Sequence, residues 1–226
     1  SIPRDLFVPF PNETDMHMIN TAFVFGELKK PGGGPEYVMQ TIQYNFGIPI
    51  QAYVIASFDT LVGIVDAVGG VDIDVPYTID DPQYPDMNYG YDPLYVAKGM
   101  THMDGALALK YARTRHQTDD FERTRRQQQV ILAVRQKALA DIPHLVGQAP
   151  GLWNRLSADI ATDLSFDQWL SLGWYVKDFS TQNIHHNTID NTYIRVIPYQ
   201  GNTVITIDRT AIATLMAQTF GPDFGK

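Results

Sequence analysis

The sequence predicts an α/β or α+β fold in which helices flank a central mixed β-sheet. Apolar residues recur at helical spacing in several segments, short strand-like segments lie between these, and glycine- or proline-rich turns separate the two kinds. The chain has 226 residues, 44% of them hydrophobic and 19% charged, so it is able to bury a sizeable core. No repeat or clear linker is evident, and we expect one domain over residues 1–226.

In the first third of the chain, two short helices are expected at residues 18–28 and 35–47. The KKPGGG sequence at residues 29–34 breaks the chain between them. The apolar run QAYVIASF at residues 51–58 predicts a buried strand. These segments begin the alternation of helix and strand that indicates the fold class.

A third helix is predicted for residues 58–70, with Asp59 as its N-cap and Gly69-Gly70 as its stop. Residues 71–76 alternate with period two and predict a strand. Residues 77–98 contain many Pro, Asp and Tyr residues and are expected to be a loop. Loops of this length are uncommon without a function, so the tyrosines are either a saccharide-contacting surface or part of a variable surface loop.

The second half of the chain continues the same alternation. Helices are predicted at 102–113, 120–140, 165–179 (capped by Ser165) and 209–220, a short strand at 159–164, and a hairpin of strands 192–198 and 202–208 that turns at Gln200-Gly201-Asn202.

Composition excludes several classes of function. The net charge is −8 and the isoelectric point is about 5.1, which argues against general nucleic-acid binding. The absence of cysteine excludes disulfides, thiolate metal sites and cysteine nucleophiles. No run approaches 18 apolar residues, and no initiator methionine or signal peptide is present. The chain starts at SIPRD, so we expect a trimmed or processed fragment.

Arginine is concentrated in one short segment, YARTRHQTDDFERTRRQQQ, at residues 111–129. Five of the ten arginines of this acidic chain fall between residues 113 and 126: Arg113, Arg115, Arg123, Arg125 and Arg126. A charge-dense helix start is often only a solvated surface, where salt bridges contribute little. The alternative is an anion-binding site.

Helical phase separates these arginines into two groups. Four apolar residues recur at helical spacing and are expected to face the core: Val130, Ile131, Val134 and Ala138. Extending this stripe backwards places Arg123, Arg126 and Gln127 on the inward face, whereas Arg125 is expected to face solvent. A buried guanidinium without a partner costs several kcal/mol. Guanidinium groups match phosphate oxygens, so the segment predicts an oxyanion pocket at a helix entrance.

Two further arginines lie just before this helix, and a third cationic position lies near the start of the chain. Arg113 and Arg115 are two residues apart, so in an extended segment their side chains point the same way. Arg4 and Asp5 follow a short apolar segment that is expected to be a strand, and such strand ends often carry chemistry in α/β sheets. A local Arg4–Asp5 ion pair is the alternative interpretation.

Taken together, these segments resemble the LytR–CpsA–Psr (LCP) family of cell-wall glycopolymer ligases. The resemblance is carried, in order, by SIPRD, Ile19-Asn20 with Ala22, FDTLVGIVDAVGGVDIDVP, MDGALALKYARTRH, DDFERTRRQQQVILAV and TDLSFDQWLSL. It covers nearly the whole chain, and the arginine segment is its most specific part.

The resemblance implies a central mixed sheet flanked by helices and a hydrophobic tunnel for a lipid tail. It implies an Mg²⁺-dependent (or Mn²⁺-dependent) phosphotransferase that moves a glycopolymer from a polyprenyl-pyrophosphate carrier onto peptidoglycan. A pyrophosphatase side activity is a further expectation. By resemblance, Arg4, Asp5 and Arg123 are catalytic, Asp5 is a metal ligand, and Asp120 belongs to the same motif. The implied pyrophosphate-binding set is Arg113, Arg115, Arg123, Arg126 and Gln127.

The resemblance also implies a location and several departures from the family pattern. We expect an extracytoplasmic protein held at the membrane by an N-terminal anchor that is absent here. Absent too is the family's early strand segment, with an aspartate expected at the metal. Met18 stands where the family often has Lys, and Glu122 where it usually has Gly.

Three functions therefore compete. The first is the phosphotransferase, and the second is a non-catalytic polyprenyl-phosphate-binding carrier or regulator of envelope assembly. The third is a nucleic-acid-binding regulator, which the net charge and the inward-facing Arg123 and Gln127 disfavour.

Overall fold

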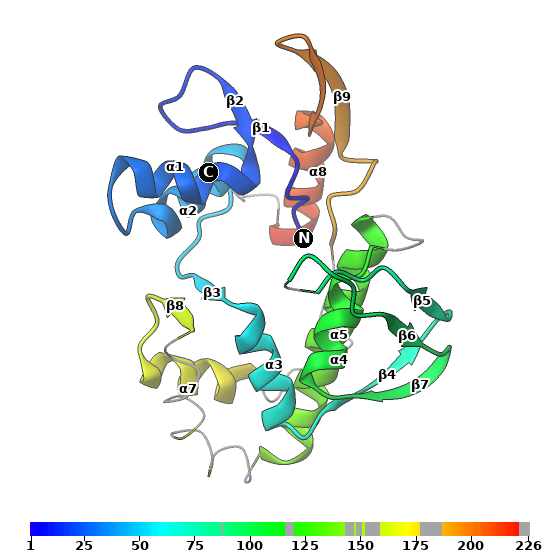
Figure 1. Cartoon of the computed structure of the whole chain (residues 1–226). Helices are drawn as coiled ribbons and strands as arrows, with labels where there is room; N and C mark the ends of the chain where they lie inside the picture. Colours follow the sequence, from blue (N-terminus) through cyan, green and yellow to red (C-terminus); the bar gives the residue numbers. More distant parts are fainter. Residues whose placement is uncertain are drawn as a thin grey trace. The chain divides into compact units, whose positions relative to one another are not determined.

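The computed structural model describes residues 1–86, 88–115, 120–142, 147, 151, 159–176 and 187–221, with the backbone alone at residues 120, 121 and 176 (Figure 1). The chain divides into two compact units, which are described separately below. Unit 1 comprises Ser1–Tyr53 and Phe179–Lys226, and unit 2 comprises Val54–Asp178. One catalytic domain over residues 1–226 stays a prediction.

Unit 1 combines two short antiparallel ladders with three helices. Its elements are β1 (Phe7–Pro9), β2 (Met16–Met18), the 3-10 turn η1 (Ile19–Thr21), α1 (Ala22–Lys29), α2 (Gly34–Phe46), β9 (Ile194–Tyr199), β10 (Asn202–Ile207) and α8 (Arg209–Phe220). Leu6, Val8 and Phe10 form a buried core with side chains of α2 and α8. Helices α1 and α2 pack closely at Gly26. A Cβ atom added there would lie only 2.5 Å from the Gly33 carbonyl oxygen, so a larger residue would not fit.

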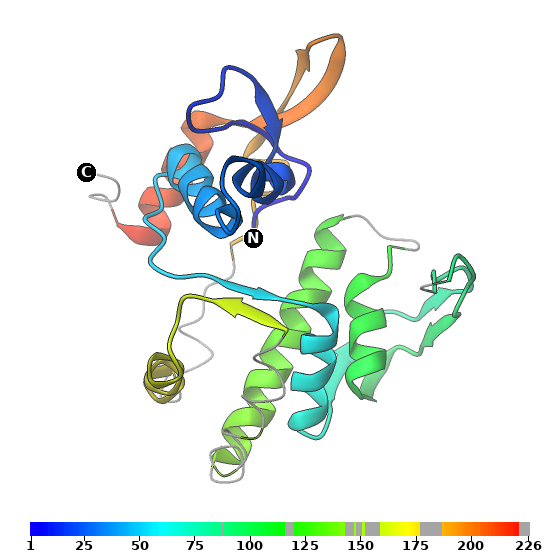
Figure 2. The ribbon, with the colours of Figure 1, turned by 60° about the vertical axis from the view of Figure 1, so that its left-hand side comes forward.

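Unit 2 carries the arginine segment and has its own core. Its elements are β3 (Val54–Ala56), α3 (Phe58–Ala67), β4 (Val71–Val75), β5 (Ile79–Asp81), β6 (Leu94–Val96), β7 (Gly99–Met103), α4 (Gly105–Arg113), α5 (Asp120–Ala140), β8 (Ile160–Thr162) and α7 (Phe166–Val176). Strand β4 buries alternate residues, Val71, Ile73 and Val75, against Tyr111 of α4 and Val130 of α5. Helices α3, α4 and α5 lie side by side (Figure 2).

The described strands do not form the single central mixed sheet that the sequence predicts. They form five two-stranded antiparallel sheets: β1–β2, β9–β10, β3–β8, β4–β7 and β5–β6. The mixed helix-and-strand class is confirmed, whereas the sheet arrangement is not. Strand partners depend on long-range packing, which the pattern within each strand does not encode. Within the described residues, no helix has the length and apolar run needed to cross a membrane.

Several predicted elements are confirmed in detail. Helix α7 begins with a reciprocal cap. The backbone N–H of Gln168 donates to Ser165 Oγ at 3.3 Å, and the backbone N–H of Ser165 donates to Gln168 Oε1 at 2.8 Å. The β9–β10 hairpin turns at Gln200 and Gly201, whose φ angles are 47° and 78°, as expected for a two-residue hairpin turn.

Three predictions in the first half of the chain are wrong. Strand β3 is only three residues long and all three are exposed. The N-cap of α3 is Ser57, whose Oγ accepts from the Thr60 amide at 3.1 Å, rather than Asp59, which lies inside the helix. Arg4 and Asp5 precede β1 in a turn and do not follow a strand. The helix predicted at residues 18–28 is present as η1 and α1, and strand β2 (Met16–Met18) overlaps its predicted start only at Met18.

Residues 77–98 are also more ordered than a loop. Strands β5 and β6 pair antiparallel within this segment, and an isolated bridge joins Pro85 to Tyr91. Strand β7, which was not predicted, follows directly and pairs with β4. The described residues of this segment therefore form a hairpin of β5 and β6.

Candidate functional site

The arginine segment lies at the junction between the end of α4 and the start of α5. A helix leaves its last carbonyl groups without intrahelical donors. Arg126 of α5 supplies such donors: its Nε donates to the Tyr111 carbonyl oxygen at 3.0 Å and its Nη2 donates to the Thr114 carbonyl oxygen. Its side chain is 2% exposed. The buried charge is thus held by carbonyl groups of the chain itself.

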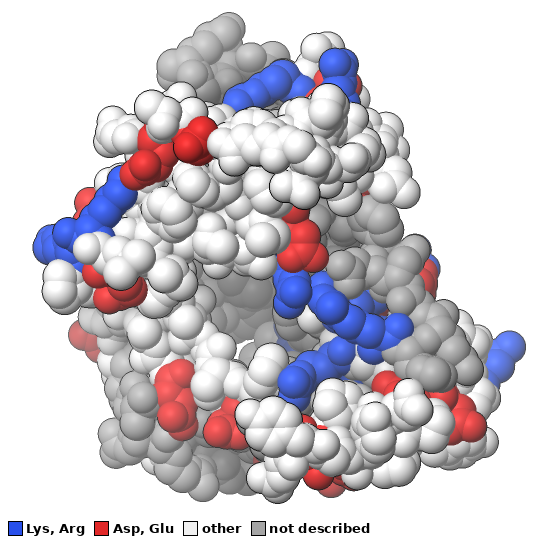
Figure 3. All heavy atoms as spheres, turned by 45° about the horizontal axis from the view of Figure 1, so that its top comes forward, with Lys and Arg blue, Asp and Glu red and all other residues white. Residues whose placement is uncertain are grey.

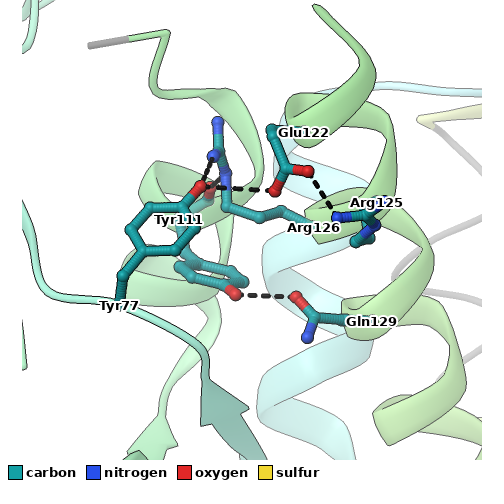
Figure 4. Close-up of polar contacts among 6 residues, drawn as sticks. All are labelled: Tyr77, Tyr111, Glu122, Arg125, Arg126 and Gln129. Carbon is teal, nitrogen blue, oxygen red and sulfur yellow. Dashed lines mark hydrogen bonds and ion pairs between the residues drawn. The ribbon is translucent and has the colours of Figure 1, made fainter. Parts of the chain in front are cut away.

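Figure 4 shows that the same guanidinium is also held from a second side. Its Nη1 donates to the Tyr77 hydroxyl at 3.2 Å, and this hydroxyl in turn lies 3.4 Å from Glu122 Oε2. Glu122 also pairs with Arg125, which is exposed as predicted. Glu122, at a position where the family usually has Gly, therefore belongs to the network that holds Arg126.

Tyr111 anchors this network to the core. It is fully buried, its hydroxyl donates to Gln129 Oε1 at 2.7 Å, and the Arg126 guanidinium lies 6.0 Å from its ring centroid. Burial raises the pKa of Tyr111 to about 12, an effect that the Arg126 charge opposes. The phenol therefore remains a neutral hydrogen-bond donor at physiological pH.

The predicted phase of α5 is correct for Arg126 and wrong for Gln127. The buried face of α5 contains Arg126, Val130 and Ala133, whereas Ile131 is 64% exposed and Gln127, four residues earlier, is exposed with it. Gln127 Nε2 nevertheless reaches the Ala112 carbonyl oxygen at 3.4 Å. Gln127 thus lies against the end of α4 with its side chain exposed to solvent. Its position therefore no longer counts against nucleic-acid binding, as an inward-facing side chain would.

Arg113 and Arg115 lie on the open side of the same junction. Arg113 is half-buried, with its guanidinium carbon 4.2 Å from the centroid of the Phe58 ring, and Arg115 is exposed. A cavity of about 270 Å³ opens beside them and is lined by Asp81, Gln83, Tyr84, Pro85, Arg113, Thr114 and Arg115. Although the net charge is −8, Lys and Arg side chains are exposed at several separate places on the face drawn in Figure 3.

Thr114 connects the two sides of the junction. Its carbonyl accepts from Arg126, and its Oγ1 donates to Asp81 Oδ2 at 2.6 Å in a buried contact. Asp81 and Thr114 escaped the sequence analysis because a buried Asp–Thr pair across 33 residues leaves no local pattern. Arg123 is half-buried on α5, one turn before Gln127 on the same face. The side chain of Asp120 lies outside the described residues.

Arg4 and Asp5 lie in unit 1 and form a local cluster there. Arg4 Nε donates to Asp5 Oδ1 at 3.1 Å, and Asn20 Nδ2 approaches the same oxygen at 3.5 Å. The Asn20 amide also donates to the Arg4 carbonyl oxygen at 3.2 Å. Asn20, quoted above only as part of the family pattern, is therefore a member of the Arg4–Asp5 group. The local ion pair that the sequence left open is present.

Asp5 is the residue that the resemblance assigns to the expected Mg²⁺. Among the described residues, no group of three or more His, Cys, Asp or Glu side chains is arranged to hold a metal ion. Mg²⁺ usually keeps several waters and takes one or two carboxylates together with substrate phosphates. The Asp5 side chain is 45% exposed, and both of its described contacts use Oδ1. A single open carboxylate of this kind fits that mode of binding.

Fold and site together define the class of protein: a mixed α/β protein with a cavity, lined in part by Arg113 and Arg115, at the end of helix α4. The sequence model of the LytR_cpsA_psr family matches residues 1–220. The chain therefore belongs to this family.

Named relatives and a solved structure agree with this assignment. The chain is 30% identical over 190 residues to the polyisoprenyl-teichoic acid–peptidoglycan teichoic acid transferase TagV of Bacillus subtilis strain 168, covering 81% of this chain and 45% of TagV. It is 31% identical over 180 residues to TagU of Bacillus anthracis, a transferase of the same description, covering 79% of this chain and 53% of TagU. The chain thus spans about half the length of these relatives.

The solved structure supports the fold. The crystal structure of B. subtilis TagV superposes with a TM-score of 0.71 at 25% identity, and the match covers 96% of this chain and 79% of that one.

Proposed function

We propose that this chain is the catalytic part of a phosphotransferase that moves a glycopolymer from a polyprenyl-pyrophosphate carrier onto peptidoglycan. The observation that carries the proposal is the open pair Arg113 and Arg115 beside a cavity, on a chain of this family. The names of TagV and TagU, which are teichoic acid transferases acting with polyisoprenyl-teichoic acid and peptidoglycan, support the same class of substrates.

In the proposed reaction, an acceptor hydroxyl of peptidoglycan attacks the phosphorus that carries the sugar. The bond from this phosphorus to the bridging oxygen breaks, and polyprenyl phosphate leaves with that oxygen. Negative charge gathers on the phosphoryl oxygens, and Arg113, Arg115 and Arg123 stabilise it with charge-assisted hydrogen bonds. Gln127 adds an amide donor at the same junction.

Arg126 has a different role in this proposal from the one that the family pattern implies. Its Nε, Nη1 and Nη2 each donate to an acceptor of the chain. We assign to it the task of holding the Arg113-Thr114-Arg115 backbone, through the Thr114 carbonyl.

Asp5 is proposed as the carboxylate that holds Mg²⁺ or Mn²⁺ and as the acceptor of the hydroxyl proton. A bound Mg²⁺ would neutralise part of the phosphoryl charge. Arg4 orients Asp5 through their ion pair. Pyrophosphatase side activity, an extracytoplasmic location and an N-terminal membrane anchor in a longer protein belong to the same proposal.

The test uses a polyprenyl-pyrophosphoryl saccharide, Mg²⁺ and a peptidoglycan acceptor. We expect the chain to release polyprenyl phosphate and to label the acceptor, and we expect Arg115→Ala to abolish both. Tight binding of the saccharide carrier without any release would instead support the second candidate, a carrier or regulator. Failure to bind the carrier at all would contradict both candidates.

A further inference from the structure

The cavity beside Arg113 and Arg115 has a second wall, which comes from the end of β5 and the turn that follows it. This wall consists of Asp81, Gln83, Tyr84 and Pro85. We propose that Gln83 and Pro85 on this wall bind the first saccharide of the lipid-linked glycopolymer. The inference rests on the proposed function, because it takes the arginine wall as the pyrophosphate site.

Covalent connectivity is the first argument. In a polyprenyl-pyrophosphoryl saccharide, the anomeric oxygen of the first sugar is bonded directly to phosphorus. A sugar whose phosphate is held by Arg113 and Arg115 must therefore lie in the same cavity or at its mouth. The side chains that share this cavity with the arginines are the candidates for sugar contacts.

The chemistry of the wall suits a sugar. The Gln83 side chain is exposed and has no hydrogen-bond partner among the residues that the structure describes. An amide offers two N–H donors and a carbonyl acceptor, which complement hydroxyl groups that both donate and accept. Pro85 is exposed beside it and presents an apolar ring to the C–H face of a pyranose. A few placed polar groups among apolar surface are typical of small-ligand sites.

The wall is also held in place before any ligand arrives. The Asp92 amide donates to the Tyr84 carbonyl oxygen at 2.8 Å, and Lys110 of α4 pairs with Asp92 at 2.5 Å. The Asp86 side chain accepts from the amides of Asn88 and Gly90, each at 2.7 Å. A preorganised wall binds its ligand with a smaller loss of conformational entropy.

One contact ties the sugar wall to the phosphate wall. Thr114, which stands between Arg113 and Arg115, donates through Oγ1 to Asp81 Oδ2 at 2.6 Å. Both residues line the cavity. This buried hydrogen bond sets the spacing between the two walls, so a sugar phosphate meets both at a defined separation.

The exposed tyrosines of residues 77–98, one candidate surface for saccharide contacts, lie outside this cavity. Tyr89 and Tyr95 are highly exposed, but neither lines this cavity. Tyr84 does line it, and it is 5% exposed. The residues that we assign to the sugar are therefore Gln83 and Pro85 rather than the exposed tyrosines.

The test measures the effect of each substitution separately on a probe with a sugar and on a probe without one. One is a short-chain polyprenyl pyrophosphate, and the other is the same lipid carrying one N-acetylhexosamine on its pyrophosphate. We expect Gln83→Ala to weaken binding of the sugar-bearing probe about five- to tenfold, the loss of one or two neutral hydrogen bonds, and to leave binding of the sugar-free probe unchanged. Gln136→Ala, at another exposed glutamine of unit 2, is the control and should change neither.

The outcomes separate the inference from the function beneath it. Equal weakening of both probes by Gln83→Ala, or no weakening of either, overturns the saccharide wall while the pyrophosphate site stands. If the unsubstituted chain binds neither probe, the proposed function itself fails, and the inference falls with it.

Discussion

Arg126 and the pair Arg113 and Arg115 lie within fourteen residues of one another, yet their guanidinium groups have different surroundings. Arg126 is 2% exposed and donates to two carbonyl groups and a phenol of the chain. Arg113 and Arg115 line a cavity instead. Arginine density alone therefore does not identify a ligand site. Burial and surroundings distinguish the two kinds of arginine: Arg126 is enclosed among acceptors of the chain, whereas Arg113 and Arg115 border a cavity.

The largest effect should come from removing the inner arginine. Arg126→Met leaves the Tyr111 and Thr114 carbonyl groups buried without their donor, and each unsatisfied group costs about 1–3 kcal/mol. We expect the free energy of unfolding in urea to fall by roughly 2–4 kcal/mol. Arg125→Met removes only an exposed ion pair and should cost less than about 1 kcal/mol. Similar losses for the two variants would contradict a structural role for Arg126.

Substitution at Arg113 or Arg115 should have the opposite effect, with little change in stability and a large loss of pyrophosphate affinity. Arg115→Ala removes an exposed guanidinium, so unfolding should change by less than about 0.5 kcal/mol. Affinity for polyprenyl pyrophosphate, measured by calorimetry, should fall about 10- to 100-fold, as expected for the loss of charge-assisted hydrogen bonds. If Arg115→Ala lowers the free energy of unfolding but leaves the affinity for polyprenyl pyrophosphate unchanged, Arg115 has a structural role like that of Arg126.

The buried Tyr111 phenol, which packs beside Arg126, should make the free energy of unfolding depend on pH. Its pKa is raised to about 12 from an ordinary value of 10, so the folded state holds its proton more tightly than the unfolded state does. This contribution to stability is complete below pH 10 and is lost as the pH rises towards 12. We expect Tyr111→Phe to unfold with about 1 kcal/mol less free energy at pH 7, because its bond to Gln129 is lost.

The same variant should show a shallower loss of stability between pH 10 and 12, measured by urea titration at each pH. Tyr95→Phe, at an exposed tyrosine of the same unit, is the control and should follow the unsubstituted chain. Identical pH profiles for Tyr111→Phe and the unsubstituted chain would show that the buried phenol does not contribute.

The smallest effect should come from Glu122. Its ion pair with Arg125 is on the surface, and its contact with the Tyr77 hydroxyl is long, at 3.4 Å. Glu122→Ala should therefore change the free energy of unfolding by less than about 1 kcal/mol and leave pyrophosphate affinity within about twofold. A loss as large as that of Arg126→Met would mean that Glu122 holds the inner arginine more firmly than these distances indicate.

Sequence reasoning identified local features of the fold better than its long-range pairings. The Ser165 cap and the Gln200-Gly201 turn follow from residues next to one another, and both are confirmed. The two-stranded ladders and β7 were missed because strand pairing is set by contacts far apart in the chain. For the same reason, an apolar run did not reveal that β3 is exposed.

At the candidate site, helical phase correctly placed Arg126 inside and Arg125 outside, but a stripe that included Ile131 misplaced Gln127. Nor does the sequence indicate that two acceptors of Arg126 are the carbonyl groups of Tyr111 and Thr114 at the end of α4, because backbone groups carry no residue signature. The partners Asp81 and Asn20 are 33 and 15 residues from the side chains that they meet. Such pairs become visible only once the chain is folded.

The central claim is that pyrophosphate binds on the Arg113 and Arg115 side of the junction and that Arg126 supports it from within. A crystal structure of the chain with a short-chain polyprenyl pyrophosphate tests this most directly. We predict phosphate oxygens within hydrogen-bonding distance of the Arg113 and Arg115 guanidinium groups, with Arg126 still bound to the Tyr111 and Thr114 carbonyl groups. Pyrophosphate bound to Arg126, or bound with neither Arg113 nor Arg115 in contact, would contradict the claim.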